Sequence, residues 1–273
     1  MRLNEELERA GGAQKASIAK YLNEAGVNEW GHLTKSGILR FRDLVTERLA
    51  PSSAKTICAA LAAFLNRYDE EDIIPCASYA ELLRLRGENC VKTFLEPDEI
   101  ERLEQVACRN MRESFVLNEF LTACKTGARI SDVREFTAEN INAGVLTYTS
   151  KKTGVTASVP CSGRTAERIE WLKQNWMEVS LKVYNEVIRR LCKRAGIDGM
   201  VKVHKGGKDK TAPKYECISS HTARISFCTI LSNVGVNLTD IAHLAGHTST
   251  NMTYRYVVKT MPKLNEQALA ILG

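Results

Sequence analysis

The segment from residue 218 to residue 257 constrains the possible fold and chemistry of this chain more than any other part of its sequence. It holds three of the chain's five histidines, two tyrosines near its end and a single acidic residue, Asp240. Apolar residues recur at helical spacing until Gly235, which predicts a helix that ends there. His221 and Arg224 stand three residues apart at the start of this helix, where both side chains can converge on one small anion near its positive end.

A second predicted helix begins at Asn237 and ends at Gly246, so His247 lies just beyond it and Tyr256 follows nine residues later. Phosphoryl transfer without a metal ion needs cationic donors, a proton donor for the leaving oxygen and a nucleophile. Arginine, histidine and tyrosine meet these needs, whereas metal-dependent phosphodiesterases use several carboxylates. The segment therefore favours chemistry on a phosphodiester with no metal and no cofactor. The competing interpretation is a core helix with satisfied histidines.

The spacing of these residues is H-x-x-R, then G-H, then a tyrosine nine residues on. It resembles the C-terminal signature of the tyrosine recombinase (phage integrase) family of site-specific DNA recombinases. The resemblance implies that His221, Arg224 and His247 are catalytic and that Tyr256 is the nucleophile. It also implies that earlier elements contribute one more arginine and a lysine.

The arginine is found in the sequence T-G-A-R-I-S-D-V at residues 126–133, which matches the family's first arginine box. The match implies that Arg129 is a catalytic residue. Asp132 follows three residues later, on the same face of a helix, and we expect it to hold Arg129 through a charge-assisted pair.

The lysine is found in the turn K-K-T-G, between two alternating segments at 145–149 and 155–159 that predict a β-hairpin. Lys152, eight residues before Pro160, occupies the position of the family's hairpin lysine. Lys151 is the alternative. Lysines on exposed hairpin turns are mostly solvated, so the assignment rests on the resemblance.

A four-ligand zinc pattern is the main competing constellation, because Cys217 and His221 are four residues apart, as are His243 and His247. We disfavour it. The recombinase spacing already assigns His221 and His247, and His243 lies one helical turn back among apolar neighbours. No metal site is expected.

Positive charge is concentrated in one stretch of this chain, whose net charge is +6. Nine Lys or Arg and two Asp lie between residues 189 and 214, which indicates contact with a polyanion, although such a stretch read alone is equally typical of a solvated loop. With the phosphate-seeking site, double-stranded DNA is the expected partner. The predicted DNA-binding residues are Lys151, Arg189, Arg190, Lys193, Arg194, Lys205, Lys208 and Lys210.

The expected fold is mainly α with a small β-hairpin or sheet (α+β), in two domains. The sequence of residues 1–92 predicts a helical bundle with a linker. The resemblance implies that this bundle is a core-binding domain. Residues 93–273 predict the catalytic domain, with a long basic connection at 196–219 and a final apolar helix that docks on its own domain or on a neighbour. No additional arm-binding domain is expected.

The nine cysteines form no C-x-x-C pair and are scattered, which is typical of core residues in a reducing compartment. No apolar stretch reaches the length of a membrane span. We therefore expect a cytoplasmic, nucleoid-associated protein.

The predicted function is site-specific recombination through a 3′-phosphotyrosyl intermediate and a Holliday junction, for the integration or excision of a mobile element or a similar task. The resemblance implies a homotetramer on paired DNA sites, and we expect a monomer in free solution. Two alternatives are a type IB-like DNA relaxing enzyme and a non-catalytic DNA-binding regulator of the same fold. A complete catalytic set argues against the regulator, because binding alone needs no nucleophile.

Overall fold

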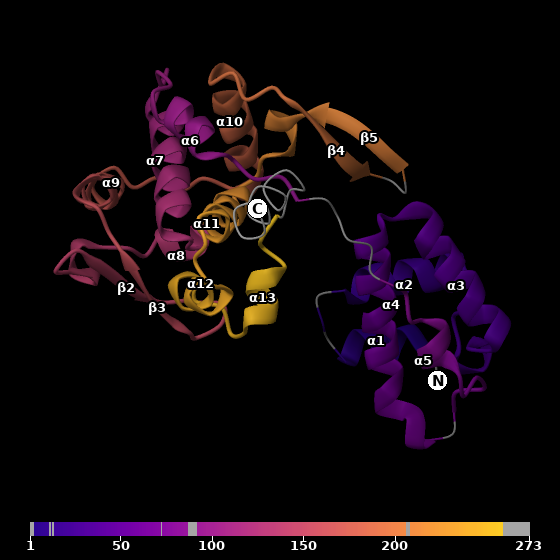
Figure 1. Cartoon of the computed structure of the whole chain (residues 1–273). Helices are drawn as coiled ribbons and strands as arrows, with labels where there is room; N and C mark the ends of the chain where they lie inside the picture. Colours follow the sequence, from indigo (N-terminus) through magenta and orange to yellow (C-terminus); the bar gives the residue numbers. More distant parts are fainter. Residues whose placement is uncertain are drawn as a thin grey trace, which may run out of the picture. The chain divides into compact units, whose positions relative to one another are not determined.

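The computed structural model describes residues 3–10, 12, 14–71, 73–86, 92–205 and 208–258. The chain divides into two compact units, one of residues 1–91 with 203–210 and the other of residues 92–202 with 211–273. Each unit has its own hydrophobic core. Figure 1 shows the elements of each unit.

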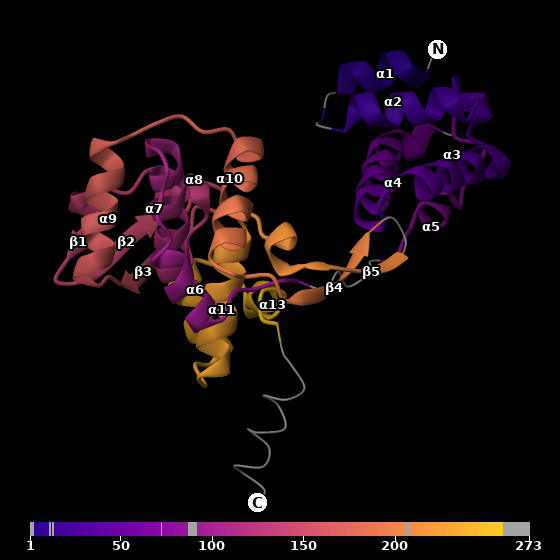
Figure 2. The same ribbon diagram turned by 90° about the horizontal axis from the view of Figure 1, so that it is seen from above.

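The first unit is helical. Its helices are α1 (Leu3–Ala10), α2 (Lys15–Glu24), α3 (Lys35–Arg48), α4 (Pro51–Leu65) and α5 (Tyr79–Leu82), with 3-10 turns at Trp30–His32 and Asn66–Glu71. Thr34 caps α3 by accepting a hydrogen bond from the Gly37 amide, and Pro51 opens α4, where its missing N–H costs nothing. Helices α1 and α2 pack side by side (Figure 2), as do α3 and α4. The helical bundle expected for this part of the sequence is therefore present.

The second unit is built around α7. Its helices are α6 (Pro97–Glu104), α7 (Met111–Thr126), α8 (Ile130–Val133), α9 (Gly163–Gln174), α10 (Leu181–Arg194), α11 (Thr222–Asn233), α12 (Leu238–Ala245) and α13 (Thr250–Tyr254), with 3-10 turns at Ala138–Asn140 and Lys214–Cys217. Helix α7 packs against α9, α10 and α11 (Figure 1), and most of its residues are buried. It ends at Gly127, which adopts a left-handed conformation that favours glycine.

An antiparallel sheet of β1 (Ile141–Asn142), β2 (Val145–Thr149) and β3 (Thr156–Pro160) contains the predicted hairpin. Side chains alternate between buried and exposed along β2 and β3, as the sequence predicts. Ala157 lies on the inward face, directly below the end of α12, where a Cβ added to Gly246 would meet the Ala157 Cβ at 3.3 Å. On the outward face, hydroxyl pairs link the strands between Thr147 and Ser158 and between Thr149 and Thr156.

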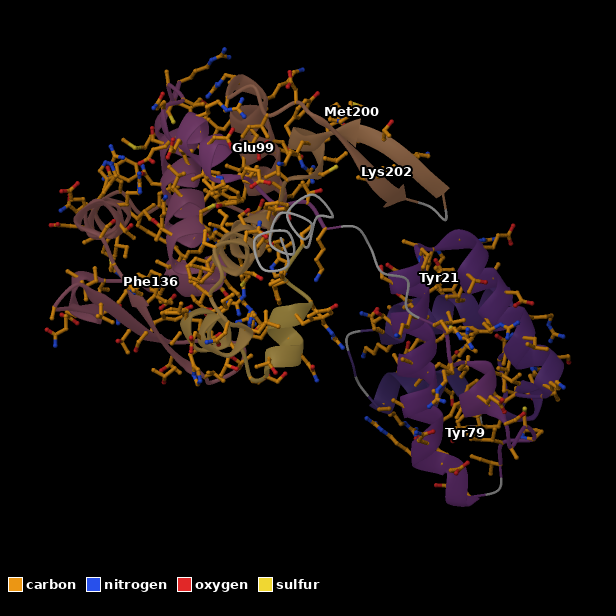
Figure 3. The ribbon with its side chains drawn as sticks, in the orientation of Figure 1. Tyr21, Tyr79, Glu99, Phe136, Met200 and Lys202 are labelled. Carbon is orange, nitrogen blue, oxygen red and sulfur yellow. The ribbon has the colours of Figure 1, made fainter. Side chains whose placement is uncertain are left out.

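A second sheet was not predicted. Strands β4 (Met200–Lys205) and β5 (Lys208–Pro213) form a two-stranded sheet within the stretch expected to be a long connection. Met200 and Lys202 both belong to β4 (Figure 3). The sequence of β5, K-D-K-T-A-P, lacks the apolar alternation that marks a half-buried strand, so the pattern gave no signal. The side chains of Lys205 and Lys208 lie outside the described part, as does the expected C-terminal helix.

None of the helices in the described ranges has the length and apolar character needed to span a bilayer.

Candidate active site

Helix α11 carries Arg224 in its first turn, where the side chain is 1% exposed. Its Nη1 donates a hydrogen bond of 2.8 Å to the Gly127 carbonyl oxygen. Within the part of the chain that the structure describes, Nε and Nη2 are buried without a well-formed hydrogen bond, although the buried Tyr148 hydroxyl lies close enough to interact with the guanidinium. A buried guanidinium with unpaired N–H groups is costly. The two free nitrogens therefore indicate an anion as the missing partner.

Gly127 brings the end of α7 close enough to reach Arg224. Its φ is +67°, and an added Cβ would lie 2.4 Å from Cδ1 of Phe227 on α11. Only glycine satisfies both the left-handed backbone and this close approach. The glycine of the arginine box thus has a packing role as well as a capping role.

Arg129 is joined to Asp132 by way of Ser150. Arg129 Nη1 and Asp132 Oδ2 are 4.0 Å apart, which is beyond direct hydrogen-bond distance. Arg129 Nη1 also donates to Ser150 Oγ at 2.9 Å, and Ser150 Oγ donates to Asp132 Oδ2 at 3.1 Å. Asp132 Oδ1 accepts from the Lys151 amide at 3.0 Å. One buried carboxylate therefore holds both the first arginine and the start of the hairpin turn.

The two turn lysines differ in their surroundings. Lys151 Nζ lies 2.7 Å from Glu135 Oε1, and both side chains are exposed, so this pair contributes little stability. Lys152 is exposed on the same turn. Partial burial and the nearby charges of Arg224, Lys92, Arg129 and Lys152, in that order, lower the pKa of His221 to about 4. The positive charge of Lys152 therefore contributes to the lowered pKa of His221.

His247 follows the left-handed cap Gly246 and is 6% exposed. Its Nδ1 is 2.9 Å from the hydroxyl of Thr253, a buried residue of α13, while among the described residues Nε2 has no partner. Burial, and to a smaller extent Arg224 and Arg129, lower the pKa of His247 to about 3. The imidazole is therefore neutral near pH 7, with one nitrogen anchored and the other available.

The ring of Tyr256 lies among the residues just described. Its centroid is 4.7 Å from that of His247, 5.1 Å from that of His221 and 5.3 Å from Cζ of Arg224. Thr229 on α11 donates its hydroxyl proton to the Tyr256 carbonyl oxygen at 3.2 Å. Tyr254, by contrast, is 62% exposed. The structure thus brings Tyr256 to the cluster and leaves Tyr254 in solvent.

A cavity of about 250 Å³ is lined in part by Arg129, His221 and Arg224. Its described lining contains three arginines, one histidine and no acid: Ala128, Arg129, Ile130, Ser131, Arg134, Leu181, Ser220, His221 and Arg224. Arg134 is paired with the buried Glu119 at 2.9 Å, so the charges left to attract an anion such as a phosphodiester are those of Arg129 and Arg224.

Comparison with known proteins identifies the protein family to which this chain belongs. The model of the phage integrase family matches residues 93–262, which contain every catalytic residue predicted from the sequence. The chain belongs to the phage integrase family. The family assignment made from the sequence is therefore confirmed.

One curated relative in this family is a tyrosine recombinase of Pseudothermotoga lettingae, 25% identical over 204 residues, a match that spans 66% of each chain. A solved lambda integrase dimer bound to a COC′ core site has a TM-score of 0.71 at 19% identity, covering 94% of this chain and 95% of the other. The Tn1549 transposon integrase in complex with a circular intermediate DNA has a TM-score of 0.70 at 15% identity, covering 98% of each chain. These matches confirm the predicted fold class. The family model and the curated tyrosine recombinase favour a DNA strand-transferring recombinase over the relaxing enzyme and the regulator.

Several of the predicted DNA-binding residues of this phage integrase family member have partners within the fold. Arg189 donates to the Ile218 carbonyl oxygen at 2.9 Å, and Arg194 pairs with Glu113 at 2.7 Å. Lys193 Nζ lies 5.4 Å from the ring centroid of Tyr215. Arg190 and Lys210 are exposed. Contact with DNA stays a prediction for all of them.

The zinc pattern is not assembled in the described ranges, which contain no group of three or more His, Cys, Asp or Glu placed to hold a metal ion. His243 is exposed and does not lie among apolar neighbours as expected. Helix α12 turns its apolar residues Ile241 and Ala245 inward, and this leaves His243 on the opposite face.

Three residues at the site were missed by the sequence analysis: Ser150, Thr253 and Lys92. Each of these residues makes its contact through the packing of separate segments, and spacing along one helix does not indicate such packing. In the sequence, only proximity to predicted site residues could have indicated them. Ser150 directly precedes the lysine turn, and Thr253 lies one helical turn before Tyr256.

Proposed function

We propose that this phage integrase family member cuts and rejoins DNA at specific sites through a 3′-phosphotyrosyl intermediate. The observation that supports this most strongly is the single tyrosine ring packed among two histidines and a buried arginine with unpaired N–H groups. Such a cluster offers a nucleophile and phosphate donors in one place. Binding alone would need no tyrosine there.

In the proposed first step the Tyr256 hydroxyl oxygen attacks the scissile phosphorus. A bond forms between phosphorus and the phenolic oxygen, and the bond to the 5′-oxygen of DNA breaks. The phenolic proton passes to His221, and Lys152 gives a proton to the departing 5′-oxygen, so charge and protons balance. A free tyrosine has a pKa of about 10, so its proton has to leave during attack.

The remaining groups stabilise the charge that develops on the phosphate. Arg129 and Arg224 present forked donors that fit two non-bridging oxygens better than lysine would. We assign the Thr253 hydroxyl as donor to His247 Nδ1, so Nε2 carries the proton and donates to a phosphate oxygen. His221 is neutral before DNA binds, which suits a proton acceptor, and a bound phosphate anion raises its pKa from its low value.

Strand exchange follows because the phosphotyrosyl bond keeps the energy of the broken bond. The free 5′-hydroxyl of a partner strand attacks the phosphotyrosine and releases Tyr256, with no need for ATP.

We propose that residues 1–92 bind double-stranded DNA as a core-binding domain and that residues 93–273 form the catalytic domain. The protein would act in the cytoplasm on nucleoid DNA that carries a mobile element or a similar site.

The proposed assembly is four copies of the chain on two DNA sites, with a monomer in free solution. Its support comes from relatives: lambda integrase has been solved as a dimer bound to a core site and as a tetramer bound to a Holliday junction. The tetramer matches this chain with a TM-score of 0.62 at 20% identity.

The test is covalent capture. Wild-type protein is incubated with a nicked suicide duplex made from DNA that flanks its gene, and the product is analysed on a denaturing gel. We expect a protein–DNA adduct with a free 5′-hydroxyl. If no adduct forms, the proposed chemistry is wrong. If adduct forms but only supercoil relaxation follows, without strand transfer between duplexes, the relaxing enzyme is the correct assignment.

A further inference from the structure

Lys92 lies against the ring of Tyr256, and no motif in the sequence indicates this lysine. Its Nζ is 5.2 Å from the ring centroid. We propose that Lys92 is a positioning residue for the nucleophile, which holds the Tyr256 ring in the site and stabilises the negative charge that the ring acquires during attack. This inference rests on the proposed function, because it assumes that Tyr256 attacks a phosphodiester.

The segment that carries Lys92 is fixed to α11. The Leu95 amide donates to Ser226 Oγ at 2.8 Å, and Ser226 Oγ donates in turn to the Thr222 carbonyl oxygen at 2.8 Å. Phe94 and Leu95 are both buried. The lysine therefore extends from a backbone that is anchored three residues away, inside the second unit.

The segment that carries Tyr256 is fixed to the same helix. Thr229 binds the Tyr256 carbonyl oxygen, and its Oγ1 accepts from the Val258 amide at 3.1 Å. Ser226 and Thr229 are three residues apart on α11, so they lie on neighbouring positions of one face. Helix α11 thus sets the separation between Lys92 and Tyr256 through two hydroxyl anchors.

The electrostatics agree with this placement. The charge of Lys92 contributes to the lowered pKa of His221, after burial and Arg224, and it opposes the effect of burial on the pKa of Cys228. Both residues flank Arg224 in or next to α11. The ammonium group therefore lies in the field of the active site.

A cation beside the ring can favour the transition state over the ground state. A neutral phenol attracts a cation through the quadrupole of its ring alone. As the hydroxyl loses its proton and attacks, negative charge spreads over oxygen and ring, so the attraction to Lys92 and Arg224 grows. Only an interaction that strengthens in this way raises the rate of the chemical step.

The role assigned to Lys92 differs from that of Lys152, because Lys152 serves the leaving oxygen and Lys92 serves the attacking one. A DNA substrate with sulfur in place of the bridging 5′-oxygen separates the two. A thiol has a pKa of about 8.5, so it departs as a thiolate without a donated proton. Such a substrate restores a variant that lacks the leaving-group acid and does not restore one whose nucleophile is impaired.

The experiment compares Lys92→Met, which keeps an apolar stem and removes the charge, with Lys92→Arg and with wild type. Lys173→Met, at an exposed lysine of α9, is the matched control. Single-turnover cleavage of the suicide duplex is measured at saturating DNA, beside the Kd. We expect Lys92→Met to cleave about tenfold more slowly with an unchanged Kd. Lys92→Arg should keep most of the rate, Lys173→Met should equal wild type, and the 5′-thio substrate should leave the Lys92→Met defect in place.

Three outcomes would overturn the inference. Rescue of Lys92→Met by the 5′-thio substrate would make Lys92 a leaving-group acid. A weaker Kd with an unchanged rate would make it a phosphate anchor, and an unchanged rate and Kd would give it no role. Because wild type is assayed first on the same duplex, failure of the proposed function appears as the absence of any adduct and is distinct from all three.

Discussion

Two tyrosines two residues apart have opposite surroundings in this chain, and their hydroxyl groups should have opposite importance. Tyr256→Phe removes one oxygen and little volume, so we expect an intact fold, unchanged DNA binding and no covalent adduct. Tyr254→Phe should retain the adduct, since this side chain is exposed. The measurement is the suicide-duplex assay with both variants. An adduct from Tyr256→Phe together with none from Tyr254→Phe would move the nucleophile by two residues.

Ser150 should matter for rate because it joins Arg129 to Asp132. Ser150→Ala leaves the buried carboxylate of Asp132 and the half-buried guanidinium of Arg129 without their shared partner, which costs about 1–3 kcal/mol. We expect cleavage to slow by about tenfold or more at unchanged DNA affinity. Ser158→Ala, on the outward face of β3, is the control and should behave as wild type. Equal loss of rate and affinity in Ser150→Ala would contradict a positioning role.

The lowered pKa of His247 predicts a dependence of stability on pH. Its folded pKa of about 3 lies below the usual value of 6.5, so the unfolded chain binds more protons between these values. The free energy of unfolding should therefore fall as pH drops from about 6.5 to 5, by up to about 1.4 kcal/mol per pH unit. Urea unfolding at several pH values measures the slope. His247→Asn should reduce the slope and leave the part that comes from His221, whose pKa is also lowered, to about 4. A slope that depends on the exposed His243 instead would refute the assignment.

At the scale of elements, the junction of α7 and α11 depends on Gly127. Gly127→Ala introduces both a strained backbone and a collision with Phe227, so we expect a loss of about 2–4 kcal/mol. Gly154 has the same φ of +67°, and a Cβ added there would meet nothing within 4 Å. Gly154→Ala should therefore cost only about 1–2 kcal/mol, the backbone strain alone. Thermal unfolding of both variants tests this, and equal losses would mean that the contact with Phe227 yields easily.

The same elements show what the sequence can and cannot predict. The hairpin and the helices that end at Gly235 and Gly246 were predicted from local periodicity and turn residues. The predicted catalytic residues came from motif spacings that resemble those of the family. Ser150, Thr253 and Lys92 depend on how separate elements pack, which spacing does not encode. Strands β4 and β5 were missed since their residues are polar and charged and show no alternation.

For the whole molecule, the chemistry proposed here requires no divalent cation. The cations near the proposed phosphate site are arginines of the cavity lining and the lysines whose charges act on His221, so cleavage in excess EDTA should proceed at the rate seen without it. Adduct formation with and without the chelator is the measurement, and DNA affinity is followed in parallel as a control. Loss of adduct in EDTA that magnesium restores would show that the mechanism is wrong.

The contact between Gly246 and Ala157 sets a practical rule for mutagenesis of the hairpin. We expect a larger residue at position 157 to press against the α12 cap at Gly246, which directly precedes His247. Positions 147, 149, 156 and 158 face outward and hold only hydroxyl pairs. Substitutions at these four positions should therefore perturb the active site less than a larger residue at Ala157 does.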